Sequence, residues 1–313
     1  MTSVDAGTDR LDAHEAVFVD DDAELLTVAR EHLAAGLEAG DLVRASLPGW
    51  AVAELEPLLP GAVLLVSGAQ QQPRREPDLI SWIRKTTGEL APRRLRLMGL
   101  VTGADVRDWD ERSRCEAISN LAYGDRAVSI RCLYDRRSTP DGALDAALRT
   151  HPRLATPDGL VASPRFEDPR AFLGGLPVPD EPLERSTPVL AVDAAPSLPR
   201  LRHQVSEALR GRARDRDVEE DFHLAISEIA ANAFRHGTKP ISARLWASAD
   251  RLVCAITDSG TTYRNPLAGY RPAHGDDLSR GGMGLWLARK LCDHVDLISQ
   301  QNGFTVRLVT VLR

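Results

Sequence analysis

The stretch AISEIAANAFRHG, residues 225–237, lies in a run whose apolar residues recur every three or four positions. That spacing predicts a long amphipathic helix over residues 216–235, which ends before Gly237. Glu228 and Asn232 are four residues apart, so both side chains lie on one face of this helix. Because that face is polar on an otherwise apolar helix, we expect it to line a cleft.

This polar pair has the chemistry of a magnesium and phosphate site. The carboxamide oxygen of Asn232 is a hard ligand of the kind that Mg²⁺ accepts beside phosphates and water. Glu228 can act as a general base for a hydroxyl or water that approaches a phosphoryl group. An exposed Glu/Asn pair can also have no role, so the interpretation depends on other segments.

Two glycine-containing segments lie downstream. DSG, residues 258–260, follows a strand-like run over 252–257 and places a carboxylate where it can accept a hydrogen bond from an exocyclic amine. Gly260 has no Cβ and lets a ring come close. RGGMGL, residues 280–285, opens an amphipathic helix whose first N–H groups can bind an anion. Each segment alone is a common turn or loop, but the three in this order are far more specific.

Together, the three segments resemble the N, G1 and G2 boxes of the GHKL ATPase superfamily, which is shared by gyrase, the heat-shock chaperone and histidine kinases. With GGMGLWLARKLCDHVDL (residues 281–297), they are most similar to the anti-sigma-factor serine kinase branch, over about the last 125 residues. The resemblance implies ATP and Mg²⁺ as cofactors. It implies that Asn232 holds Mg²⁺ and that Glu228 is the catalytic base. It implies that Asp258 and Gly260 bind adenine, with Thr305 as a further adenine contact. Gly282 and Gly284 would form the hinge of an ATP lid.

The lid itself would be residues 261–280. Arg264, Arg271 and Arg280 are available there for the phosphates. The resemblance leaves open which of them makes the contact.

The periodicity of the C-terminal region predicts a two-layer α+β sandwich, in line with the GHKL type. We expect helices over 198–209, 216–235 and 285–295, and strands over 241–247, 252–257, 295–299 and 304–312.

Short apolar runs alternate with helical patterns in the N-terminal half. We expect strands over 16–19, 42–45, 62–66, 94–101 and 127–133. Strands separated by helices indicate an α/β domain, with a mostly parallel sheet and helices on both faces. Neither a phosphate loop nor a dinucleotide-binding glycine pattern is present in this half.

Four stretches of the N-terminal half resemble the MEDS sensory domain of methylotroph and methanogen regulators, which is similar to RecA-type folds without their phosphate loop. They are residues 14–43 (HEAVFVDDDAELLTVAREHLAAGLEAGDLV), 130–137 (IRCLYDRR), 148–155 (LRTHPRLA) and 163–169 (SPRFEDP). The resemblance implies that this domain senses a small-molecule signal. The residues at recurring positions are His14, Cys132, Tyr134 and His151, each of which can equally be structural. Their spacing alone is not a metal-binding pattern.

Composition is that of an ordinary globular protein, with 43% hydrophobic and 27% charged residues over 313 residues. The net charge of −6 argues against a general nucleic-acid or membrane-surface binder. The N-terminus lacks the order of a signal peptide and no apolar run is long enough to span a bilayer, so we expect a cytoplasmic protein. The four cysteines show no Cys-x-x-Cys spacing and are expected to be reduced and buried.

Pro and Gly are dense between residues 155 and 199. We therefore expect a sensory domain over 1–165, a linker over 166–188 and the ATPase domain over 189–313.

The sequence favours a sensor-coupled kinase that phosphorylates a serine or threonine of an anti-sigma antagonist protein. A non-catalytic, ATP-dependent binding switch for a sigma factor or antagonist fits the same residues. A sensor histidine kinase fits less well, because it needs a phosphoacceptor histidine on a dimerising hairpin and only His203 lies on a nearby helix. A homodimer is common in the anti-sigma branch, but the apolar stripe over 198–209 is expected to pack within its own domain.

Overall fold

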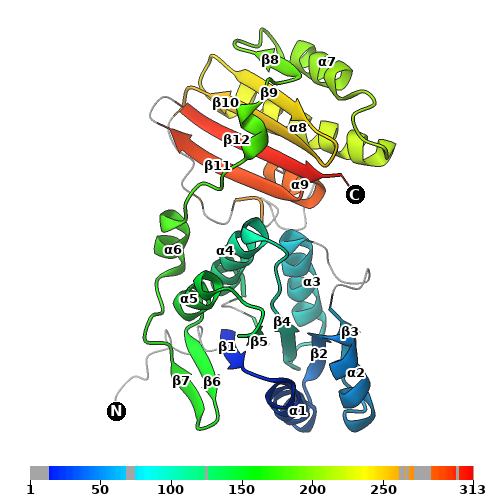
Figure 1. The fold of residues 1–313 in the computed structure, drawn as a ribbon, viewed down its shortest axis with the longest axis vertical. Helices are drawn as coiled ribbons and strands as arrows, with labels where there is room; N and C mark the ends of the chain where they lie inside the picture. Colours follow the sequence, from blue (N-terminus) through cyan, green and yellow to red (C-terminus); the bar gives the residue numbers. More distant parts are fainter. Residues whose placement is uncertain are drawn as a thin grey trace. The chain divides into compact units, whose positions relative to one another are not determined.

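The protein is described by a computed structural model, in which the chain divides into two compact units, residues 1–176 and 177–313 (Figure 1). The structure describes residues 14–67, 75–123, 126–260, 265, 268–270, 283–300 and 303–312.

The N-terminal unit is built on a seven-stranded sheet in the order β3-β2-β4-β5-β1-β6-β7, in which all neighbours are parallel except β6 and β7. Its strands are β1 (His14–Val19), β2 (Leu42–Leu47), β3 (Val63–Val66), β4 (Leu95–Leu100), β5 (Val128–Asp135), β6 (Arg153–Thr156) and β7 (Gly159–Ala162). Its helices are α1 (Asp22–Glu38), α2 (Gly49–Leu55), α3 (Glu76–Glu89), α4 (Val106–Tyr123), α5 (Asp141–Thr150) and α6 (Pro169–Gly175), with a 3₁₀ turn η1 (Glu56–Leu58).

Helices cover both faces of this sheet. Successive residues of each strand point to opposite faces, and both faces carry apolar side chains that the helices bury. Val17 of β1 and Leu133 of β5 belong to the apolar cluster that α1 and α2 complete. Their neighbours Ala16 and Cys132 belong to a second cluster, with Ala147 of α5. The predicted α/β class with a mostly parallel sheet is confirmed.

The hairpin β6–β7 lies largely in the Pro- and Gly-rich stretch for which the sequence pattern predicts loops. Each strand has four residues, which is too short to show a periodic pattern. Its turn depends on Gly159, whose φ of +116° favours glycine.

The C-terminal unit has a five-stranded antiparallel sheet in the order β11-β12-β10-β9-β8. Its elements are the 3₁₀ turn η2 (Pro182–Arg185), β8 (Leu190–Val192), α7 (Leu198–Leu209), α8 (Arg216–His236), β9 (Ser242–Ala247), β10 (Arg251–Asp258), α9 (Gly284–Leu291), β11 (His294–Gln300) and β12 (Gly303–Val311).

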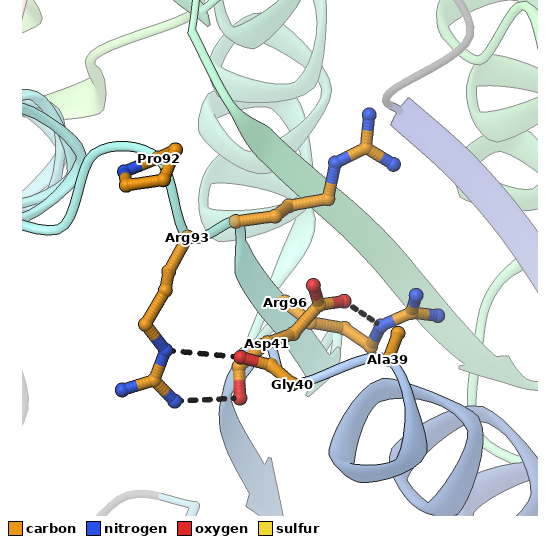
Figure 2. Close-up of a pocket in the computed structure, with 7 residues that line it drawn as sticks. Ala39, Gly40, Asp41, Pro92, Arg93 and Arg96 are labelled. Carbon is orange, nitrogen blue, oxygen red and sulfur yellow. Dashed lines mark hydrogen bonds and ion pairs between the residues drawn. The ribbon is translucent and has the colours of Figure 1, made fainter.

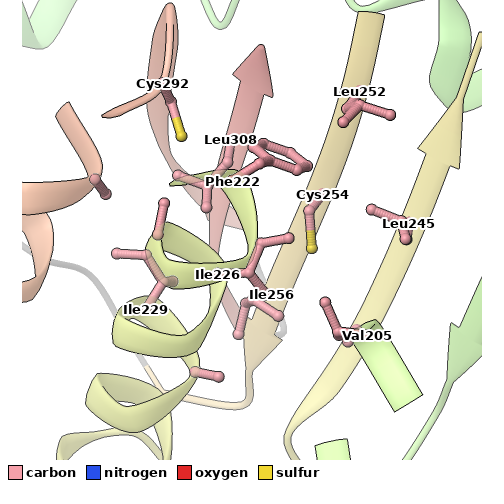
Figure 3. Packing of buried hydrophobic residues seen from close by; sticks show 14 of the residues in the cluster. Val205, Phe222, Ile226, Ile229, Leu245, Leu252, Cys254, Ile256, Cys292 and Leu308 are labelled. Atoms are coloured by element: carbon pink, nitrogen blue, oxygen red, sulfur yellow. The ribbon is translucent and has the colours of Figure 1, made fainter. Parts of the chain in front are cut away.

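The three helices share one apolar core with one face of the sheet. Figure 3 shows Phe222, Ile226 and Ile229 of α8 against Cys254 and Leu308 of the central strands. The opposite face carries a smaller cluster around Trp246, Val253, Ala255 and Val309. This is the predicted two-layer α+β sandwich.

All four cysteines are buried and none of the four forms a disulfide, as the sequence predicts. Burial, with Cys292 close by, raises the pKa of the Cys254 thiol. In the described part of the chain, no helix is both long enough and apolar enough to cross a membrane.

Phe222 is completely buried at the centre of the C-terminal core. We expect Phe222→Ala to lower the free energy of unfolding of this unit by about 3–5 kcal/mol, because it leaves a cavity between α8 and the sheet. Hydrogen exchange of the β10 amides measures this unit separately. Leu224→Ala is the matched control, since Leu224 is an exposed residue of the same helix. Equal protection of β10 in both variants would contradict the assignment.

Candidate functional site

The polar pair of α8 faces the first residue of α9. Glu228 and Asn232 are half-buried, whereas Gly284 is buried. A Cβ on Gly284 would lie 2.7 Å from Asn232 Nδ2 and 3.3 Å from Glu228 Cβ. A Cβ there would displace the Asn232 amide, so glycine suits this close approach of α9 to both side chains.

The end of α8 contacts the end of β10. The Oδ1 atom of Asp258 accepts hydrogen bonds from Thr238 N–H at 3.2 Å and Gly260 N–H at 2.7 Å. A Cβ on Gly237 would lie 2.8 Å from Asp258 Cγ. These contacts hold the carboxylate in one orientation. Within the described residues, its Oδ2 atom accepts no side-chain or turn hydrogen bond.

Thr305 lies on the neighbouring strand β12, one register position away from Asp258. It pairs in register with Thr257, and the two hydroxyl oxygens are 2.8 Å apart. Gly303, where β12 begins, has so little room that a Cβ would lie 2.4 Å from Asp258 O. The start of β12 is therefore held tightly against the end of β10.

The C-terminal half of α8 thus links the predicted residues. Asn232 touches Gly284, and Gly237, five residues farther along the chain, touches Asp258. At a rise of about 1.5 Å per residue, these two contacts are about 7–8 Å apart along the helix. The arrangement offers a carboxamide, two carboxylates and the N-terminal N–H groups of α9 along one short stretch.

Gly282 and the three candidate lid arginines, Arg264, Arg271 and Arg280, lie outside the described residues. Of the predicted lid, residues 265 and 268–270 are described.

One anchor of this segment was missed by the sequence reasoning. The buried Arg289 of α9 donates hydrogen bonds to Ala268 O at 3.0 Å and Val295 O at 3.1 Å. Its guanidinium carbon lies 4.1 Å from the centre of the Tyr270 ring. The sequence does contain a sign that Arg289 is buried: it is four residues after Leu285 and falls on the apolar stripe of the predicted helix.

The predicted sensory residues of the N-terminal unit also come together. His14, Cys132 and His151 gather around Glu116, a residue of α4 that no sequence pattern singled out. Burial raises the pKa of Glu116, but the hydrogen bond with His14 and the nearby His151 outweigh it and hold the pKa well below its usual range. Burial, with His14 adding to it, lowers the pKa of His151. Tyr134 lies in the same cluster, where burial and the Glu116 charge raise its pKa.

A shallow hollow of about 420 Å³ lies at the amino ends of β2 and β4 (Figure 2). Arg93 donates to the carbonyls of Gly40 and Asp41, and Arg96 pairs with the Asp41 carboxylate at 2.8 Å. Ligands of parallel α/β sheets bind at the carboxyl ends of strands, which is the opposite edge. These arginines therefore tie two loops together.

Helix α7 packs inside its own unit. Leu201, Val205 and Leu209 are at most 1% exposed in the C-terminal core, while His203 is exposed. This confirms the predicted intramolecular packing of the stripe.

Two family models match the chain. The histidine kinase-like ATPase domain matches residues 190–310. The MEDS (MEthanogen/methylotroph, DcmR Sensory) domain matches residues 13–152. Both resemblances drawn from the sequence are thus confirmed.

Curated relatives match the C-terminal unit. The serine-protein kinase RsbW of Bacillus subtilis (strain 168) is 34% identical over 107 residues, which are 31% of this chain and 66% of that protein. The protein of the same name from Bacillus velezensis is 33% identical over 104 residues, 30% of this chain and 64% of its own. The chain therefore spans just under two thirds of the length of these relatives.

A solved structure, of the RsbU and RsbW domains of Rv1364c from Mycobacterium tuberculosis, is 20% identical and covers 39% of this chain and 30% of that one. Its TM-score of 0.27 is too low to carry an argument.

We expect Arg289→Met to release residues 268–270 from α9, because the variant leaves two carbonyl oxygens without their hydrogen-bond donor. Each unsatisfied carbonyl lowers the stability of this packing by about 1–3 kcal/mol. Hydrogen exchange and limited proteolysis of this segment measure the release. Lys290→Met, the neighbouring half-buried cation on the same helix, is the matched control. Unchanged protection in Arg289→Met would show that other contacts hold the segment.

Proposed function

We propose that the C-terminal unit binds Mg-ATP and transfers its terminal phosphoryl group to a serine or threonine of an anti-sigma antagonist protein, under control of a signal read by the N-terminal unit. The observation that carries this proposal is the contact of Gly284 with Glu228 and Asn232. The matches to serine-protein kinases over this unit support it.

The residues fit a magnesium nucleotide. Gly237, Gly260 and Gly284 let the backbone lie close to the Asp258 and Asn232 side chains, where a ligand on this side of α8 would bind. In the described part of the chain no side chain caps the N-terminus of the eight-residue helix α9, whose first N–H groups and positive dipole end favour an anion.

Asn232 and Glu228 would take different roles. The amide oxygen of Asn232 would be the protein ligand of Mg²⁺, which usually binds few protein groups. Glu228, one turn earlier, would accept the proton of the attacking hydroxyl. Bound Mg-ATP supplies the phosphoryl group and the neutralising charge for its transfer. Positioning of the hydroxyl against the nucleotide would then be the main task of the protein.

Asp258 would recognise the base. Its Oδ1 atom is held by two backbone N–H groups, so Oδ2 can accept a hydrogen bond from the adenine amine without reorientation. Thr305 and its partner Thr257 place two hydroxyls on the adjacent strands. Gly282 would complete the lid hinge with Gly284.

The anti-sigma resemblance implies a sigma factor or its antagonist as the partner. It also implies a cytoplasmic location and a homodimer. A non-catalytic switch would use the same residues to change partner affinity with ATP. The histidine kinase alternative is weaker, because α7 is a single helix whose apolar side is buried in its own unit.

We expect Asn232→Ala to weaken Mg-ATP binding at least several-fold, because the metal loses its protein oxygen ligand. Titration calorimetry with and without Mg²⁺ measures the effect. His203→Ala, an exposed change on α7, should bind like the wild type. If the wild type bound no ATP, the unit would be a nucleotide-independent scaffold.

We expect Glu228→Gln to lower phosphoryl transfer by about 10²–10⁴-fold while ATP affinity stays within about twofold, because only proton removal is lost. The assay follows labelled phosphate from ATP to water and to the serines of candidate antagonist proteins. Glu207→Gln, an exposed residue of α7, is the control. A wild-type rate in Glu228→Gln would rule out the base. ATP-dependent partner affinity without any transfer by the wild type would favour the switch.

A further inference from the structure

Four side chains of the kinds that bind metals converge in the N-terminal unit. His14 begins β1, Glu116 is in α4, Cys132 is in β5 and His151 follows α5. One ligand atom from each lies within 4.8 Å of all the others. His14, Cys132 and His151 are buried, and the Glu116 side chain is 12% exposed.

The fold accounts for this convergence. Strands β1 and β5 are parallel neighbours in which His14 pairs with Ile130, two residues before Cys132. Because side chains alternate, His14 and Cys132 lie on the same face of the sheet. Helices α4 and α5 cover that face and bring in Glu116 and His151.

Both histidines are oriented by hydrogen bonds at Nδ1. His151 Nδ1 lies 2.9 Å from Ala147 O, which can only accept. His14 Nδ1 lies 3.1 Å from Asn120 Oδ1, and the Asn120 amide is fixed by donation from Nδ2 to Thr150 O at 2.7 Å. Each Nδ1 therefore carries hydrogen, and each Nε2 faces the other ligand atoms. This is how metal-bound histidines are usually held.

The surroundings of the His151 Nε2 atom favour a metal site over a simple hydrogen-bond network. It is fully buried and has no hydrogen-bond partner in the described part of the chain. Its neighbour at 3.5 Å is Glu116 Oε2, which is itself an acceptor. A buried lone pair directed at a carboxylate is costly unless a cation lies between them.

Of the remaining distances, the two that involve Cys132 fit one small cation, and the third is a hydrogen-bond distance that would lengthen when a cation binds. His14 Nε2 lies 2.9 Å from Glu116 Oε2 and 3.5 Å from Cys132 Sγ, and Cys132 Sγ lies 3.3 Å from Glu116 Oε2. Tetrahedral donors at metal–ligand distances of about 2.0–2.3 Å are about 3.3–3.8 Å apart. The other carboxylate oxygen, Oε1, accepts from Tyr134 O–H at 3.4 Å. Oε2 is thus the carboxylate oxygen that faces the other three ligand atoms.

We propose that His14, Glu116, Cys132 and His151 form a buried tetrahedral site for a divalent transition-metal ion, with Zn²⁺ as the best fit. Two imidazoles, a thiolate and a carboxylate suit Zn²⁺, whereas Mg²⁺ and Ca²⁺ prefer oxygen ligands alone. Four protein ligands leave no open position, so the ion ties β1, β5, α4 and the end of α5 together. Binding releases the thiol proton of Cys132 to solvent, together with any proton held between His14 and Glu116.

The test is metal analysis of the full chain, purified in reducing buffer without chelator, followed by removal of the metal and titration with Co²⁺. We expect about one Zn²⁺ per chain, and Co²⁺ should show tetrahedral ligand-field bands with a thiolate-to-metal charge-transfer band. Cys132→Ser should remove the charge-transfer band and weaken binding at least tenfold. Cys115→Ser is the matched control, since Cys115 is a buried cysteine beside Glu116 but outside the cluster.

Glu116→Gln keeps the size of the side chain and should also weaken binding, which covers the case in which Cys132→Ser does not fold. A wild-type chain that is purified without metal and shows no thiolate band with Co²⁺ would overturn the proposal. So would an unchanged charge-transfer band in Cys132→Ser, because the thiolate would then come from another cysteine.

Discussion

Burial of one face of α8 against the antiparallel sheet is the constraint on which the C-terminal unit depends. Phe222, Ile226 and Ile229 are at most 3% exposed, so the rotation of the helix about its axis is fixed. Glu228 and Asn232 are then directed toward α9 rather than toward the sheet. This rotation brings Asn232 so close to Gly284 that a Cβ on residue 284 would displace the Asn232 amide. The apolar core therefore determines where the polar site can form.

The N-terminal unit depends on a similar constraint: burial of apolar side chains fixes which face of each strand a residue points to. Alternation along β1 and β5 sends Val17 and Leu133 into the core under α1 and α2. It sends His14 and Cys132 to the other face, where α4 and α5 close over them. Polar ligand atoms can be buried there because the neighbouring carbonyl of Ala147 and amide of Asn120 satisfy the outer imidazole nitrogens.

Much of the fold follows from sequence periodicity. Helix α8 and strands β9, β10 and β12 are long, with regular apolar patterns, and their predicted limits agree with the structure to within one or two residues. The hairpin β6–β7 and the three-residue strand β8 were not predicted, because their pairing depends on neighbours brought by the rest of the fold rather than on a local pattern. Arg289 was missed because a charge on an amphipathic helix is usually solvated, whereas here two carbonyls and an aromatic ring receive it.

The two sites differ in how far the sequence alone can reveal them. The residues around α8 are grouped in short segments: Glu228 and Asn232 lie within one helical turn, and Asp258 and Gly260 lie in one tripeptide. The cluster around Glu116 has no such local pattern: His14 is 102 residues before Glu116, and Cys132 is 16 residues after it. Pairing of β1 with β5 brings His14 and Cys132 together, and packing of α4 on that face of the sheet brings in Glu116. A carboxylate in the middle of α4 has no distinguishing spacing. Its role becomes visible only in the structure, where His151 Nε2 lies 3.5 Å from it and has no hydrogen-bond partner among the described residues.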